Sequence, residues 1–163
     1  MKKLFIGFSI FISINSWTSP ITEEKAISKL NQFFELLDIE VYKQDDISRI
    51  LTKDFQIFEM GKSWSMEEFD TFLQEAAKTT VSTDWVLSKY KVSIDSSSVH
   101  ISYVNNGIFK TTNNETIYSH WLESTYMVLD DGELKLKFLL KAFSHCRPVL
   151  ICLIDSKVLK LLF

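Results

Sequence analysis

The hydrophobic pattern of the chain changes its period near residue 81, and this change limits the folds that the chain can adopt. Before that point, apolar residues recur at steps of three and four over residues 22–42, which predicts one long helix that begins after Thr22. Its apolar stripe consists of Ile27, Leu30, Phe34, Leu37 and Val41. From Val81 onward, apolar and polar residues alternate, as in strands with one buried face. The pattern therefore predicts an α+β fold with helices first and a sheet last.

Three further elements are expected between the long helix and residue 81. Asp45 or Asp46 can cap a short second helix whose apolar residues are Ile47, Ile50 and Leu51. Residues 55–60 have the composition of a strand that ends at Gly61. Ser65 and Glu68 form a capping box, which predicts a third helix that runs through Phe69, Phe72, Leu73 and Ala76.

The second half predicts a series of antiparallel strands. Residues 90–94 and 99–103 should form a hairpin across the serines at 96–98, followed by a long strand over residues 117–129. A last strand follows the turn at Asp130, Asp131 and Gly132, with Leu134, Leu136, Phe138 and Leu140 alternating with two lysines. The predicted order is α-α-β-α-β-β-β-β. No linker is long enough to separate two domains.

The length of that last turn decides which side chains of the long strand face inward. A two-residue turn at 131–132 pairs Leu129 with Leu134 and directs Trp121, Glu123 and Thr125 inward. A three-residue loop reverses the sides and directs His120, Ser124 and Tyr126 inward. We favour the two-residue turn because it aligns more apolar neighbours.

The N-terminus has the layout of a signal peptide. Lys2 and Lys3 precede an apolar run over residues 4–14, and a polar stretch follows it. We assign residues 1–18 to this segment, with cleavage after Ser16 or Thr18, which makes the protein secreted or periplasmic. The apolar run is about half of the roughly 20 residues that a spanning helix needs, which disfavours the alternative of an uncleaved anchor.

We expect one domain over residues 21–146 and an apolar C-terminal extension over residues 147–163. The extension should dock on the domain, and a loosely attached end is the alternative. Export would permit a disulfide between Cys146 and Cys152, although both can equally serve as small apolar residues.

Composition and motifs exclude several functions. The chain carries 18 basic and 21 acidic residues, and this balance offers no general attraction to nucleic acid. The sequence contains no metal-ligand spacing, Gly-rich phosphate loop or nucleophile motif, so neither a metal nor a cofactor is predicted. Asn114 begins a glycosylation acceptor that would matter only in a eukaryotic source.

The order of the predicted elements resembles the NTF2-like superfamily, in particular its SnoaL-like and ketosteroid-isomerase-like branch. The likeness covers residues 21–144. Its local matches are residues 33–38 (FFELLD), residues 51–55 (LTKDF), and Asp131-Gly132 before an alternating strand. The resemblance implies a cone in which a curved, mostly antiparallel sheet wraps around the first helix and leaves a pocket between them. Many such proteins pair through the outer face of the sheet.

The resemblance to the isomerase branch also implies three functional positions. A tyrosine that donates to an oxyanion falls on Phe33, which has no donor. A carboxylate base falls on Glu59, which keeps the chemistry. A buried acid falls near Ser124 or Thr125, and neither is an acid. Steroid-type isomerisation is therefore not predicted, and Glu59 is the candidate general base, with a side chain that points to water as the alternative.

These considerations favour binding over catalysis. We expect a secreted domain that binds a small apolar molecule in its pocket, or a protein partner through its sheet. The alternative is a small lyase, isomerase or hydrolase that uses Glu59, together with Glu123. The pocket is expected to be lined by Phe33, Asp54, Trp64, Tyr103, Trp121, Glu123 and Thr125. We also expect a homodimer through Leu122, Tyr126 and Leu139 on the outer sheet face, and no span of a membrane after cleavage.

Overall fold

A computed structural model describes residues 21–59 and 61–143. The predicted signal peptide, the two cysteines and the C-terminal extension lie outside the described residues. Within the described ranges, no helix combines the length and the apolar character needed to cross a bilayer.

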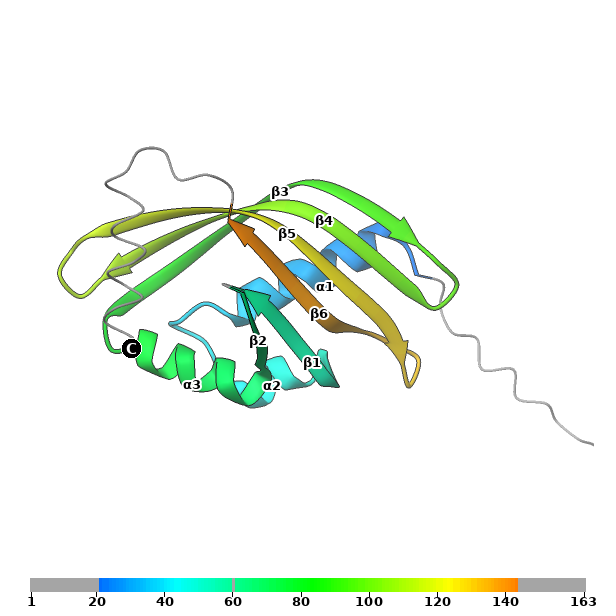
Figure 1. Cartoon of the computed structure of the whole chain (residues 1–163), viewed down its shortest axis with the longest axis horizontal. Helices are drawn as coiled ribbons and strands as arrows, with labels where there is room; N and C mark the ends of the chain where they lie inside the picture. Colours follow the sequence, from blue (N-terminus) through cyan, green and yellow to red (C-terminus); the bar gives the residue numbers. More distant parts are fainter. Residues whose placement is uncertain (1–20, 60, 144–163) are drawn as a thin grey trace, which may run out of the picture.

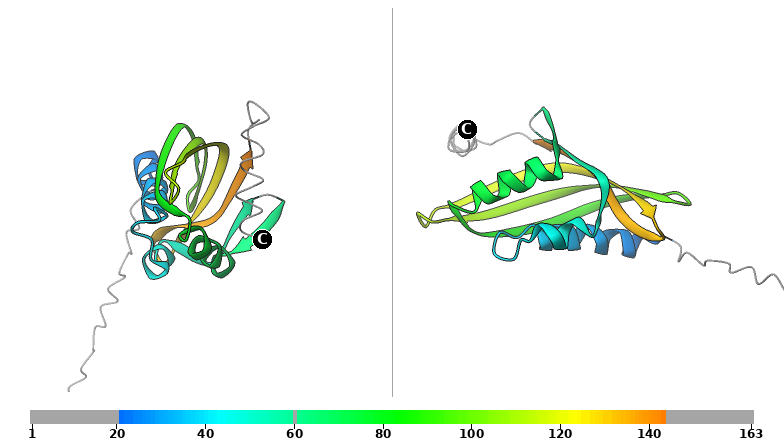
Figure 2. Two further views of the ribbon diagram at one scale, coloured as in Figure 1. Left: turned by 90° about the vertical axis from the view of Figure 1, so that its left-hand side faces the viewer. Right: turned by 90° about the horizontal axis from the view of Figure 1, so that it is seen from below.

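The described residues form an α+β fold in which a curved sheet arches over the helices (Figures 1 and 2). The order of the strands in the sheet is β2-β1-β6-β5-β4-β3, and only the pair β1 and β6 is parallel. The predicted α+β cone is thereby confirmed. The elements are α1 (Glu23–Leu36), α2 (Gln44–Ser48), β1 (Leu51–Glu59), β2 (Lys62–Ser65), α3 (Met66–Ala76), β3 (Thr80–Ile94), β4 (Ser98–Thr111), β5 (Thr116–Asp130) and β6 (Glu133–Phe143).

Helix α1 begins as predicted and ends earlier than predicted. The side chain of Thr22 caps its first turn. After Leu36 the chain turns, because the Thr83 hydroxyl accepts the N–H of Ile39 and donates to Asp38 Oδ1. Val41 therefore does not join the apolar stripe and is 55% exposed. The predicted extension of this helix to residue 42 is wrong because a contact with β3 replaces its last turn.

The segment between α1 and α3 differs from the prediction in two places. Helix α2 begins after Lys43 with no side-chain cap, and Asp45 and Asp46 lie in its first turn instead, where carboxylates favour a helix N-terminus. Strand β1 already begins at Leu51, and the four-residue strand β2 is too short to show an alternating pattern. The capping box is confirmed, since the Ser65 N–H donates to the Glu68 carboxylate and the Glu68 N–H donates to the Ser65 hydroxyl.

The turn between β5 and β6 has the predicted two residues. Asp131 and Gly132 have φ angles of 52° and 82°, as the tight turns of hairpins require. Leu129 pairs with Leu134, so the predicted register is confirmed and the three-residue loop is wrong. Farther along the hairpin the register shifts by one residue, because Tyr126 pairs with Phe138 while Met127 pairs with Leu136.

This β-bulge at Lys137 changes the faces of β6. Leu136 and Leu139 are both fully buried on the inner face, whereas Leu140 is 45% exposed. The prediction that residues 134, 136, 138 and 140 share one face is therefore wrong for the last two. The same shift removes Leu139 from the outer face, where it was expected to contribute to a dimer.

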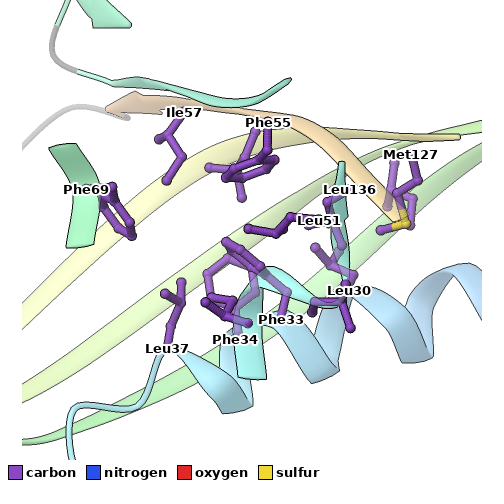
Figure 3. Close-up of a cluster of buried hydrophobic side chains, with 14 of the residues drawn as sticks. Leu30, Phe33, Phe34, Leu37, Leu51, Phe55, Ile57, Phe69, Met127 and Leu136 are labelled. Carbon is purple, nitrogen blue, oxygen red and sulfur yellow. The ribbon is translucent and has the colours of Figure 1, made fainter. Parts of the chain in front are cut away.

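The core lies between α1 and the concave face of the sheet (Figure 3). Phe33 and Phe34 of α1 are each 1% exposed and meet edge to face, and Phe33 also contacts Phe55 of β1. Phe69 of α3 closes one side of this cluster (Figure 3). The core thus packs α1 against the concave face of the sheet. Polar side chains lie on another part of the same inner face.

Candidate functional site

Four neighbouring strands each place one polar side chain on the same rung of the inner face. Tyr103 of β4 lies directly opposite Glu123 of β5, and Glu123 lies opposite Lys141 of β6. Glu59 follows Phe58, whose partner is Leu140, so that Glu59 lies beside Lys141. We call Tyr103, Glu123, Lys141 and Glu59 the polar row.

The charged members of the polar row are close together and largely shielded from water. Lys141 Nζ lies 3.7 Å from Glu59 Oε2 and 4.0 Å from Glu123 Oε1. The exposed fractions of the three side chains are 6% for Lys141, 12% for Glu59 and 0% for Glu123. One ammonium thus lies between two carboxylates, and Glu59 does not point to water.

The β-bulge at Lys137 is the reason that Lys141 belongs to this row. Residues directly opposite each other in an antiparallel pair share a face. If the register of Leu129 and Leu134 continued unchanged, Leu140 would lie opposite Glu123 and Lys141 would face outward. The bulge therefore places the ammonium of Lys141 beside Glu123. With regular alternation along β6, Glu123 would be buried beside Leu140 instead.

Asn105 is the next inward-facing residue of β4 after Tyr103, and polar atoms beside it have no partners. Its amide nitrogen donates to Glu123 Oε1 at 3.2 Å, and the residue is fully buried. Within the described part of the chain, Asn105 Oδ1, Glu123 Oε2 and Trp85 Nε1 are buried and have no hydrogen-bond partner. Such atoms are rare in native proteins, because a buried polar group without a hydrogen bond costs free energy.

Burial controls the protonation of this site. Burial raises the pKa of the Glu123 carboxyl, while Lys141, the Tyr103 hydroxyl and the Asn105 amide act in the opposite direction and stabilise the carboxylate. Burial and the negative charge of Glu123 hold the pKa of Tyr103 well above its ordinary value. Tyr103 is therefore a neutral hydroxyl, and it lies 3.2 Å from the Thr125 hydroxyl.

Three aromatic rings form a wall beside the polar row. The rings of Trp85, Phe109 and Trp121 contact one another, with centroid distances between 5.4 and 6.2 Å. Lys141 Nζ lies 5.1 Å from the ring of Trp121 and 5.5 Å from that of Trp85, within the range of cation–π attraction. We call these three residues the aromatic wall.

Gly107 makes room for the aromatic wall. A Cβ atom at this position would lie 2.8 Å from both Phe109 Cε2 and Trp121 Cζ3, which is closer than real contacts allow. The glycine thus lets two rings approach the backbone of β4.

The structure brings together four of the residues predicted to line the pocket. Tyr103, Trp121, Glu123 and Thr125 are all buried on the inner face of β4 and β5. His120, in contrast, is exposed and pairs with Asn106.

The other three predicted residues lie elsewhere. Phe33 belongs to the core. Trp64 packs against Phe72 of α3. Asp54 is exposed and forms an ion pair with Lys137.

The sequence reasoning missed Asn105 and Lys141. Asn105 could have been found, because it continues the alternation of Val99, Ile101 and Tyr103 with a polar residue on an otherwise apolar face. Lys141 gives no such signal, because its direction depends on the bulge.

A surface groove of about 450 Å³ runs between α1 and β3. Phe34, Trp85 and Tyr90 contribute its aromatic lining, and Glu35, Asp38 and Asp84 contribute acidic groups. Trp85 therefore belongs both to this groove and to the aromatic wall. Over the described residues, no group of three or more His, Cys, Asp or Glu side chains is arranged to hold a metal ion.

Comparison with known proteins identifies the fold. The sequence matches no protein-family model and none of the curated proteins with which it was compared. Among solved structures, it is similar to a nuclear transport factor 2 (NTF2-like) superfamily protein from Salmonella enterica, with a TM-score of 0.64 and 9% identity over 77% of this chain and 93% of that chain.

Two further solved structures are similar in the same way. One is a hexachlorocyclohexane dehydrochlorinase (LinA) type 2, with a TM-score of 0.60 and 10% identity over 74% of this chain and 86% of that chain. The other is a CaMKII hub from S. rosetta, with a TM-score of 0.61 and 12% identity over 77% of this chain and 99% of that chain. Identities this low show the fold and leave the function open. The chain therefore has the NTF2-like fold, as the order of its predicted helices and strands indicated.

Proposed function

We propose that the inner face of the sheet binds a small, largely apolar molecule. The apolar body of this molecule lies against the aromatic wall, and its polar end reaches the polar row. The observation that carries the proposal is the pair of buried acceptors without partners, Glu123 Oε2 and Asn105 Oδ1. An unsatisfied buried polar group costs about 1–3 kcal/mol, which a correctly placed ligand group would offset.

The combination of groups also supports binding of a molecule with two kinds of surface. Binding sites for small molecules are mostly apolar and aromatic, with a few polar groups that fix the orientation of the ligand. Here Trp85, Phe109 and Trp121 provide ring faces, while Glu123 and Asn105 provide directional acceptors. The aromatic wall would bind the body of the ligand and the acceptors would select its polar end.

Isothermal titration calorimetry of the full chain with phenethyl alcohol tests this proposal, together with native mass spectrometry of any molecule that copurifies. Asn105→Leu should weaken binding of the alcohol at least about tenfold, which corresponds to about 1.4 kcal/mol. Asn106→Leu is the matched control, because Asn106 is the next residue of β4 and contacts His120 on the other face. Equal losses in both variants, or neither saturable binding nor a copurified molecule, would contradict the proposal.

A second candidate function is acid–base catalysis by a small lyase, isomerase or hydrolase. Its support is that Glu59 and Glu123 face the same row, and that burial raises the pKa of Glu123 while Glu59 is the more accessible carboxylate. Glu59 would be the general base and Glu123 the acid. Lys141 weakens this candidate, because its ammonium lies 4.0 Å from Glu123 Oε1 and favours the charged form of the group that would have to act as the acid. Turnover that Glu59→Gln abolishes without loss of ligand binding would favour it over binding alone.

We also infer that the mature protein is exported and pairs with a second copy through the outer face of the sheet. Leu122 and Leu140 are 50% and 45% exposed there, and the rings of Tyr126 and Phe138 stack at 5.5 Å. A monomer at all micromolar concentrations in sedimentation equilibrium would contradict the pairing. A product that retains residues 1–18 in the cytoplasm would contradict the export.

A further inference from the structure

We propose that the ligand of this site is uncharged and carries a hydrogen-bond donor such as a hydroxyl group, and that the polar row rejects carboxylates and phosphates. This inference rests on the proposed binding function and names the chemical class of the ligand.

The requirement for a donor follows from the two buried atoms without partners. The Asn105 amide nitrogen is occupied by Glu123 Oε1, and this contact leaves the amide oxygen as the free end of the side chain. An amide oxygen and a carboxylate oxygen both accept hydrogen bonds. The ligand group that satisfies either atom must therefore donate. When Glu123 is protonated, Asn105 Oδ1 remains an acceptor.

The exclusion of anions follows from the balance of charge. Glu59 and Glu123 flank Lys141, so the ammonium is already paired on both sides. The three groups together carry a formal charge of −1 when both glutamates are ionised, and Tyr103 adds no positive charge. An anionic ligand would meet a lysine whose charge is already offset, together with two carboxylates in a site shielded from water.

A cationic ligand is disfavoured for a related reason. The ammonium of Lys141 already lies between the carboxylates and over the rings of Trp85 and Trp121. A second cation in this site would lie close to this ammonium and would be repelled by it. An uncharged ligand leaves the row intact.

The unpaired donor of Trp85 adds one further constraint. Trp85 Nε1 is buried and has no hydrogen-bond acceptor among the described residues. A hydroxyl group both donates and accepts, so it matches acceptors and a donor with one functional group. An ether or a ketone offers only the acceptor.

Three probes of similar size distinguish these classes. Phenethyl alcohol is uncharged and donates, phenethyl methyl ether is uncharged and only accepts, and phenylacetate is an anion. In calorimetric titrations of the full chain near neutral pH, the alcohol should bind at least about tenfold more tightly than either of the other probes.

The variant Glu123→Gln connects this selectivity to the polar row. Glutamine keeps the shape of the side chain and removes its charge, so the preference for the alcohol over phenylacetate should fall at least about fivefold. Glu115→Gln is the matched control, because Glu115 is exposed in the turn between β4 and β5. The control should leave the preference unchanged.

The results separate this inference from the proposal on which it rests. Phenylacetate or the ether binding as tightly as the alcohol to the unmodified chain would overturn the assigned ligand class while leaving a binding site in place. An unchanged preference in a folded Glu123→Gln variant would remove the polar row as its cause. Failure of all three probes, with no copurified molecule, would refute the binding function itself.

Discussion

Replacing Lys141 with methionine tests the energetics of the polar row directly. Its ammonium lies 3.7 Å from Glu59 Oε2 and 4.0 Å from Glu123 Oε1. At an effective dielectric constant of about 20, each such contact corresponds to an attraction of about 4 kcal/mol before desolvation is subtracted. Removing one partner of a buried ion pair typically costs about 3–5 kcal/mol, because the remaining charge stays buried. We expect Lys141→Met to lower the free energy of unfolding by this amount.

A second lysine of the same strand provides a matched control. Lys137 Nζ lies only 2.6 Å from Asp54 Oδ2, but the two side chains are 40% and 68% exposed. Exposed ion pairs contribute little because water and salt screen them. Lys137→Met should therefore leave stability almost unchanged, although its ion pair is the shorter of the two. The comparison separates the effect of burial from that of distance.

Urea unfolding near neutral pH, followed by far-ultraviolet circular dichroism, measures both variants. Small domains have a total stability of about 5–15 kcal/mol, so Lys141→Met could leave much of the chain unfolded. The double variant Lys141→Met/Glu123→Gln removes one of the two unpaired carboxylates and should recover a measurable part of the loss. Equal effects of Lys141→Met and Lys137→Met, or a double variant less stable than Lys141→Met alone, would refute the reasoning.

Three further changes test other parts of the structure. Burial raises the pKa of the Glu123 carboxyl above its ordinary value of 4.5, so the folded state binds a proton at Glu123 more tightly than the unfolded state does. The stability that results is fully present below pH 4.5 and is lost as the pH rises through the pKa of the folded state. Glu123→Gln should flatten the dependence of the urea midpoint on pH over this range, and an unchanged slope would show that Glu123 does not cause it. Gly107→Ala should lower the free energy of unfolding by about 1–3 kcal/mol and alter tryptophan fluorescence, because the new methyl group overlaps the ring of Trp121. Unchanged stability and unchanged fluorescence would show that the ring can move aside. Ser65→Ala should lower stability by about 1 kcal/mol in urea unfolding through loss of the α3 cap, whereas Ser63→Ala, at an exposed position of β2, should have no such effect.

Local signals were sufficient for several features of the fold and of the site. Thr22 begins α1 and Ser65 begins α3, because a side-chain cap acts within three residues of its own position. The pair Asp131-Gly132 adopts the positive φ angles of a tight turn, and this turn sets the register of the hairpin. Alternation from that register then directs Trp121 and Glu123 inward, as predicted.

Contacts between segments that lie far apart in the sequence determine the end of α1 and the composition of the polar row. The end of α1 depends on Thr83, which lies on β3, accepts the N–H of Ile39 and donates to the Asp38 side chain. Glu59 and Lys141 become neighbours only because β1 and β6 pair in parallel, although they lie far apart in the sequence.

The polar row illustrates where sequence reasoning ends. The sequence determined that Glu123 faces inward, because side-chain direction in a strand alternates with a fixed period of two. It did not determine that Lys141 faces the same way, because the bulge at Lys137 breaks that period. Whether a bulge forms depends on how the strand packs against its two neighbours. It also depends on which side chains the bulge buries on each face of the sheet. The counter-charge of Glu123, and with it the chemistry of the site, therefore depends on the tertiary structure.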